Sequence, residues 1–345
     1  MKRRWLSFLF SLLISGGLLF FLFSRIEIGR LKEVLVSLYW PWLVIYLVVA
    51  LAASLLRTWR YQLLLKPRPA KFGDFLLVTL IRNLFVDLLP ARLGSLSYVY
   101  LTNRSLNYPF QAAASSFLLA FLFDFLTLTP FLLVAIAWVG GRASALNSFY
   151  LVVISILFFA LILIIFTQLE KILRCLAAGG SRLKQKKRLT RWKWLQRFLN
   201  LATAKSQETA EELVRVKKSQ SSWLIFFLSL LIRSCKYISL YFLLSALLHH
   251  ELFNSTMLDF WTTILAITGA ELTSVLPIKG LAGFGTWEAA WALSLSLMGY
   301  EAQLAIISGL GLHLLTNLYE YSLGIGAIII LTLRSPSSFS KKDIR

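Results

Sequence analysis

Charged residues, acidic residues and cysteines are all scarce in this 345-residue sequence. Only 15% of the residues are charged, whereas soluble domains carry about 25%, and 58% are apolar. This balance excludes a water-soluble enzyme and an intrinsically disordered chain. The two cysteines, Cys175 and Cys235, lie far apart in the sequence and support no disulfide framework. The composition therefore indicates a polytopic membrane protein.

Motifs of the common enzyme classes are also missing. The sequence has no Gly-x-Ser-x-Gly elbow, no Walker loop and no Cys-x-x-Cys pair. His250-Glu251 resembles the start of a zinc-protease helix, but Asn254 stands where that helix needs a second histidine. We therefore expect no catalytic residues, no metal site and no cofactor, and we predict that the chain is not an enzyme.

Long apolar segments are abundant. A helix needs roughly 20 apolar residues to cross the hydrocarbon layer of a bilayer. Six segments have about this length or more: Trp5–Ser24, Leu38–Leu56, Phe110–Val139, Phe149–Gln168, Ser222–Leu248 and Ala302–Leu333. The first of them follows Met-Lys-Arg-Arg and has no cleavage site after it, so we predict a signal anchor there.

Two further apolar segments are interrupted by proline and glycine. Phe75–Leu89, roughly 22 Å long as a helix, runs into Pro90-Ala-Arg-Leu-Gly94. Leu258–Leu276 likewise runs into Pro277-Ile-Lys-Gly-Leu-Ala-Gly-Phe-Gly285, and a second short apolar run follows. Each segment is either one crossing or a hairpin that enters the membrane and returns. The residues predicted at the hairpin turns are Pro90, Gly94, Pro277, Gly280, Gly283 and Gly285.

The distribution of basic residues decides between these alternatives. Basic residues outnumber acidic ones by 36 to 16, a formal net charge of +20. The amino terminus, 57–74, 171–220 and 334–345 hold 26 of the 36, so the positive-inside rule places all four regions in the cytoplasm. Only hairpins satisfy that placement, and basic residues confined to one side of the membrane do not indicate nucleic acid as a partner.

We therefore predict an all-α polytopic protein of the plasma (inner) membrane. It has six full spans and two oppositely oriented re-entrant helical hairpins, and both termini are cytoplasmic. The whole of 1–345 forms a single integral membrane domain, and 72–139 and 258–333 form an inverted repeat, an arrangement typical of transporters. The basic cytoplasmic loop 171–220 contains apolar residues at helical spacing over 188–199, which fits either an amphipathic helix on lipid headgroups or a solvated loop.

Polar residues inside the apolar segments are the candidate binding residues, because charge within a bilayer is costly. Arg92 and Lys279 lie at the predicted hairpin turns, where free backbone N–H groups add to their charge, so a phosphate fits there. The alternative for both residues is a structural pairing with carboxylates. Arg233 and Lys236 share one helix face and are further cavity candidates. The full set of predicted substrate-binding or translocation residues is Asn83, Arg92, Asp124, Glu271, Lys279, Glu288, His313 and Asn317.

Asn83 and His313 have structural alternatives as well. Asn83 either orients a headgroup or supports a turn, and His313 either binds a ligand or hydrogen-bonds within the packed helices. The acidic members of the set either accept protons or pair with the basic residues, and in the flippase interpretation they shape the polar cavity.

The segment Pro277-Ile-Lys-Gly-Leu-Ala-Gly-Phe-Gly-Thr-Trp-Glu-Ala-Ala290 resembles a signature of the lysylphosphatidylglycerol synthase transmembrane, or flippase-like, family. Pro90-Ala-Arg-Leu-Gly94 and Asp124 match two further parts of the family pattern. The sequence departs from it at Ser95, where the family has Glu, at Ala120-Phe121, where it has Glu-Arg, and at His313, where it has Arg. These departures concern proton coupling and headgroup identity.

The resemblance implies lipid translocation, and because the spans occupy the chain it implies no aminoacyl-transferase domain. The expected function is a flippase that moves an anionic phospholipid or a polyprenyl-phosphate-linked lipid between leaflets. Its expected partners are membrane lipids with a phosphate-bearing headgroup. Two alternatives remain: a secondary transporter of a small anion, and a non-transporting accessory subunit of a membrane glycosyltransferase or envelope-synthesis complex. A homodimer or an envelope-synthesis enzyme as partner is left open.

Overall fold

The regular elements in the computed structural model are all helices over the residues that it describes. These residues are 28–65, 70–89, 94–140, 148–185, 222–249, 258–273 and 284–334, with 17, 21, 24–25, 203–204, 207–211 and 214. The helices are α2 (Ile28–Val36), α3 (Trp40–Leu64), α4 (Phe72–Leu88), α5 (Leu96–Arg104), α6 (Phe110–Gly140), α7 (Ser148–Gln185), α9 (Ser222–Leu247), α10 (Phe260–Thr273), α11 (Thr286–Leu297) and α12 (Ala302–Arg334).

Five described helices are long and apolar enough to cross a membrane: α3, α6, α7, α9 and α12. They correspond to five of the six predicted spans and confirm an all-α polytopic membrane protein. The sixth predicted span, Trp5–Ser24, lies almost wholly outside the described residues. The segment 188–199 lies wholly outside them.

The predicted end of the second span at Leu56 is wrong, because α3 continues to Leu64. Arg57 and Arg60, counted above with the cytoplasmic loop 57–74, therefore lie on a membrane helix. The Arg60 side chain is fully buried, as is that of the neighbouring Tyr61. The prediction from hydropathy ended the span before Arg57, its first charged residue. In the structure the helix continues, and the charge of Arg60 is compensated by Asp124 inside the protein. In the same way α7 runs on to Gln185, so the first part of 171–220 is helical.

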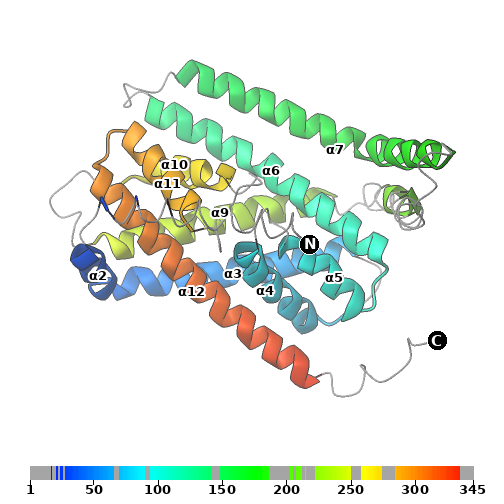
Figure 1. Ribbon diagram of the computed structural model, residues 1–345, viewed down its shortest axis with the longest axis horizontal. Coiled ribbons are helices and arrows are strands. Elements are labelled where there is room, and N and C mark those ends of the chain that lie inside the picture. Colours follow the sequence, from blue (N-terminus) through cyan, green and yellow to red (C-terminus); the bar gives the residue numbers. More distant parts are fainter. Residues whose placement is uncertain are drawn as a thin grey trace.

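The short helices form two pairs in different parts of the bundle. The helices α4 and α5 pack against each other, and so do α10 and α11. Figure 1 shows the first pair toward one end of the long axis and the second pair toward the other, with α3, α9 and α12 passing between them. Among the buried contacts, α3 packs along α9 and α12 packs along α4. The polar residues of both pairs can therefore face the same central space.

Glycine is required at one position next to each pair. A Cβ on Gly94 would lie 1.6 Å from the Phe85 carbonyl oxygen, so the chain after α4 can return against its last turn only without a side chain. Gly285 has φ = 90° immediately before α11, a conformation that glycine adopts without strain. The other predicted turn residues, Pro90, Pro277, Gly280 and Gly283, lie outside the described residues.

Candidate functional site

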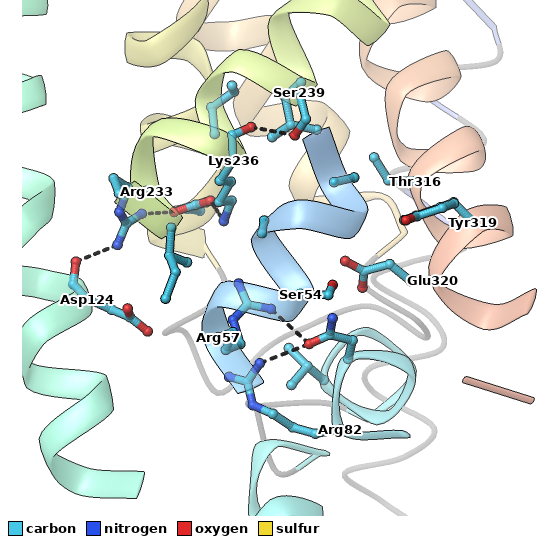
Figure 2. Close-up of a pocket in the computed structure, with 18 of the residues that line it drawn as sticks. Ser54, Arg57, Arg82, Asp124, Arg233, Lys236, Ser239, Thr316, Tyr319 and Glu320 are labelled. Carbon is cyan, nitrogen blue, oxygen red and sulfur yellow. Dashed lines mark hydrogen bonds and ion pairs between the residues drawn. The ribbon is translucent and has the colours of Figure 1, made fainter. Parts of the chain in front are cut away.

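A cavity of about 280 Å³ lies where helices of both short pairs meet α3, α6, α9 and α12 (Figure 2). One part of its wall is aromatic and apolar, from Phe117, Phe121 and Phe125 on α6. The rest of the wall combines further apolar residues with many polar ones. Its polar side chains are those of Tyr46, Ser54, Arg57, Arg82, Asn83, Ser95, Asp124, Arg233, Lys236, Ser239, Thr268, Glu271, His313, Thr316, Asn317, Tyr319 and Glu320.

Two arginines share one neutral acceptor in this cavity. The Nη1 atom of Arg57 donates a hydrogen bond of 2.9 Å to Oδ1 of Asn83, and Nη1 of Arg82 donates one of 3.2 Å to the same oxygen (Figure 2). Asn83 is only 6% exposed. Within the described part of the chain, neither guanidinium forms an ion pair. Two positive charges are thus held side by side on a neutral amide, and we name these three residues the arginine clamp.

Asp124 ties three helices together beside the clamp. Its carboxylate accepts hydrogen bonds from Arg60 of α3, at 2.6 Å from Nη1 to Oδ1 and 3.3 Å from Nη2 to Oδ2. Arg60 also donates to the Ser229 hydroxyl on α9, at 2.9 Å. From the same helix, Nη2 of Arg233 donates to the Asp124 backbone carbonyl at 2.5 Å (Figure 2). The charge of Arg60 is therefore already compensated, unlike those of the clamp.

Glu271 on α10 neutralises the remaining basic residues of α9. Its Oε2 lies 3.4 Å from Nη1 of Arg233, and its Oε1 forms an ion pair with the Lys236 ammonium. The predicted shared face of Arg233 and Lys236 is confirmed, since both line the cavity and bind one carboxylate. Across the described residues, no group of His, Cys, Asp or Glu is arranged to hold a metal ion.

Glu288 and His313 form a buried pair between α11 and α12. Glu288 is fully buried, and its Oε2 accepts a hydrogen bond of 2.8 Å from the Gly285 N–H. Its Oε1 lies 2.5 Å from Nδ1 of His313. The imidazole stacks on Phe284, with 4.4 Å between the ring centroids, and His313 is one of the residues that line the cavity. Glu288 therefore fixes the start of α11 to α12 from behind the cavity wall.

The structure brings together five of the eight predicted site residues in the cavity: Asn83, Asp124, Glu271, His313 and Asn317. Glu288 supports His313, whereas Arg92 and Lys279 lie outside the described residues. Sequence reasoning missed Arg57 and Arg60, because it assigned both to a loop. The signal that could have found them is the apolar run Leu63-Leu64-Leu65, which resumes immediately afterwards and continues the helical pattern.

Comparison with known proteins identifies the family. A search of curated proteins found no match. The sequence profile described as "Lysylphosphatidylglycerol synthase TM region" matches residues 8–324, a range that includes every residue lining the cavity. Because the match spans most of the sequence, it confirms the resemblance that the proline–glycine motifs indicated. The chain belongs to the lysylphosphatidylglycerol synthase TM region family.

Proposed function

We propose that this protein moves a lipid with a phosphate-bearing headgroup between the two leaflets of the membrane. The observation that carries the proposal is the arginine clamp, in which Arg57 and Arg82 hydrogen-bond to neutral Asn83 inside the cavity. Guanidinium groups present several N–H donors in a plane and match the oxygens of a phosphate. Like charges held close together repel, so an anion between the two arginines would be strongly favoured.

The apolar side of the cavity favours an amphipathic ligand over a small soluble anion. Phe117, Phe121 and Phe125 follow one another along α6, with ring centroids 6.2 Å and 4.7 Å apart. This aromatic face lines the same space as the arginine clamp. A hydrocarbon tail would lie against the rings, while the headgroup contacts the charged wall. A small inorganic anion has no apolar surface to bury, so contact with these rings would add nothing to its binding free energy.

The lengths of the short helices support two re-entrant hairpins beside the cavity. The helices α5, α10 and α11 contain 9, 14 and 12 residues, fewer than the roughly 20 that cross a bilayer. We propose that α4–α5 and α10–α11 are the two re-entrant hairpins and that they enter from opposite faces of the inner membrane. Their polar residues would meet midway, with both termini of the chain in the cytoplasm and with no catalytic step.

Leaflet exchange in proteoliposomes tests this proposal. Purified full-length protein is reconstituted with fluorescent phosphate-bearing lipids, and exchange is followed as the fraction accessible to an external quencher. Losing a hydrogen bond to a charged group costs about 1.5–3 kcal/mol, so Arg57→Gln and Arg82→Gln should each slow exchange about tenfold or more. The matched control is Arg334→Gln, because Arg334 is an exposed arginine paired with Asp74 at the end of α12.

Two results would contradict the proposal. One is the absence of exchange for every phosphate-bearing lipid in vesicles that contain folded protein. The other is exchange at the wild-type rate in both clamp variants. Uptake of radiolabelled phosphate by the same vesicles, without lipid exchange, would instead favour the small-anion transporter.

A further inference from the structure

Two positive charges share one carboxylate in the cavity wall. Arg233 and Lys236 lie about one turn apart on α9, and both form ion pairs with Glu271 of α10. All three residues line the cavity. The group has one positive charge in excess, and charge inside a bilayer is costly unless it is compensated. An anion that enters the cavity would supply the missing negative charge.

Lys236 is the residue of this group that can leave the carboxylate. Its side chain is 36% exposed, against 10% for Arg233 and 17% for Glu271. Among the residues that the structure describes, the Lys236 ammonium has Glu271 as its one partner, whereas Arg233 also donates to the Asp124 backbone carbonyl. If Lys236 moved away, Glu271 would keep Arg233 as its counter-ion, so no buried charge would be left unpaired. A compact ammonium on a flexible stem suits such an exchange.

Lys236 lies at a different depth in the bundle from the arginine clamp. The antiparallel helices α3 and α9 are placed in register by two contacts: Arg60 to Ser229, and the Tyr39 N–H to the Ala246 carbonyl. Counted from these contacts at a rise of roughly 1.5 Å per residue, Lys236 lies about 6 to 12 Å beyond Arg57, away from the end of α3. Figure 2 shows Lys236 and the two clamp arginines at different levels of the cavity. Lys236 is near the midpoint of α9, so it lies nearer the middle of the span than the clamp.

We propose that Lys236 is a second phosphate-binding station on the path of the lipid headgroup, nearer the middle of the membrane than the arginine clamp. The inference rests on the proposed function and adds a step to it. The phosphate would bind first to Arg57 and Arg82 and then to the Lys236 ammonium, which exchanges Glu271 for it. When the headgroup leaves, Lys236 would return to Glu271. The ligand is the phosphate of a lipid headgroup, as a monoester or a diester, because an ammonium acts as a point charge.

Exchange and binding are measured separately on the purified full-length protein. Exchange is followed in proteoliposomes with fluorescent phosphatidic acid, phosphatidylglycerol and a polyprenyl phosphate, and binding of the same lipids by native mass spectrometry. Lys236→Gln should slow exchange about tenfold or more, the usual effect of losing one hydrogen bond between charged groups. Its binding of lipid should stay within about twofold of wild type, because the clamp is intact. Arg57→Gln should instead weaken binding and exchange together.

A double variant separates phosphate binding by Lys236 from mere neutralisation of Glu271. If Lys236 only neutralises the carboxylate, Lys236→Gln/Glu271→Gln should exchange lipid at the wild-type rate, and that result would overturn the proposal. If Lys236 binds the phosphate, the double variant should stay as slow as Lys236→Gln. It also keeps the test valid should the single variant fail to fold. The matched control is Lys171→Gln, an exposed lysine on α7, which should exchange lipid like wild type.

Failure of this inference differs from failure of the proposed function. Exchange at the wild-type rate in Lys236→Gln would overturn the second station, while the clamp stands. Equal losses of binding in Lys236→Gln and Arg57→Gln would mean one joint site and would overturn the two-station path. Displacement of bound lipid by an equal concentration of inorganic phosphate would overturn the lipid assignment. If wild type moves none of the three lipids, the proposed function fails, and the second station fails with it.

Discussion

Arg60 and Asp124 join α3 to α6 through a two-pronged ion pair in which the arginine side chain is fully buried and the carboxylate is 32% exposed. Such a pair adds little net stability relative to apolar residues, but loss of one partner leaves a charge without compensation. The hydroxyl of Ser229 and the geometry of the pair hold this corner of the cavity in place. The pair is therefore a structural support of the site and not a vacant binding group.

Breaking this pair should destabilise the protein more than removing it entirely. Asp124→Asn leaves Arg60 buried without its counter-ion, which costs about 3 kcal/mol, the lower end of the range for buried pairs because Asp124 is partly exposed. The double variant Arg60→Met/Asp124→Leu should lose less than Asp124→Asn alone. Unfolding temperatures of detergent-purified protein measure both. A double variant that is less stable than the single one would show that the pair is net stabilising.

Asn83→Asp should separate the structural and binding roles of the arginine clamp. A carboxylate in place of the amide would pair with Arg57 and Arg82, which now donate to a neutral oxygen at 2.9 and 3.2 Å. Stability should be unchanged or higher, whereas binding of phosphate-bearing lipids should fall at least tenfold, because the positive charge is neutralised. Lower stability together with unchanged lipid binding would assign the two arginines a structural role only.

The sequence allowed the fold class, the family and a few residues of the cavity wall to be predicted, and each for a physical reason. Long apolar segments predict helices in a bilayer, and an acid such as Asp124 inside one of them needs a polar environment. The glycine signature around Gly285 marks a backbone conformation that other residues adopt only with strain.

The cationic centre of the site was less accessible to sequence reasoning. Arg57 and Arg60 could not be told from cytoplasmic loop residues, because the acceptors that keep them inside the protein, Asn83 and Asp124, lie on other helices. The positive-inside rule only counts basic residues in each segment, so it cannot reveal that a basic residue has a partner on another helix. Likewise, nothing local predicts that Glu288 and His313 pair across 25 residues.

The stabilising effect of the pair between Glu288 and His313 should depend on the charge of the glutamate. His313→Phe keeps an aromatic ring against Phe284 but leaves the fully buried Glu288 carboxylate with the Gly285 N–H as its one partner among the described residues. We expect a loss of about 3 kcal/mol or more, because a charge is left unpaired. The double variant Glu288→Gln/His313→Phe should recover part of that loss. The measurement is the unfolding temperature, and equal values for the two variants would argue against an ionised Glu288.

The proposed hairpins make a topological prediction. With cysteines placed singly at 195 and 345 in a Cys175→Ser/Cys235→Ser background, a membrane-impermeant maleimide should label both positions only from the cytoplasmic side. This follows because each hairpin adds no crossing, so all the strongly basic regions stay on one side. Labelling of either position from the outside would mean that α4–α5 or α10–α11 crosses the membrane, and the inverted arrangement would be wrong.

Two glycines on α12 provide a matched test of how closely α12 must approach α4. A Cβ at Gly324 would lie 2.4 Å from Cβ and 2.7 Å from Cδ1 of Leu84, whereas a Cβ at Gly326 meets nothing within 4 Å. Gly324→Ala should therefore cost about 1–3 kcal/mol through overpacking, and Gly326→Ala should be neutral or gain up to about 1 kcal/mol of helix stability. Because α4 carries Arg82 and Asn83, Gly324→Ala should also shift the arginine clamp and weaken lipid binding. Gly326→Ala should leave lipid binding unchanged. Equal effects of the two alanine substitutions on the unfolding temperature would contradict the close contact between α12 and α4.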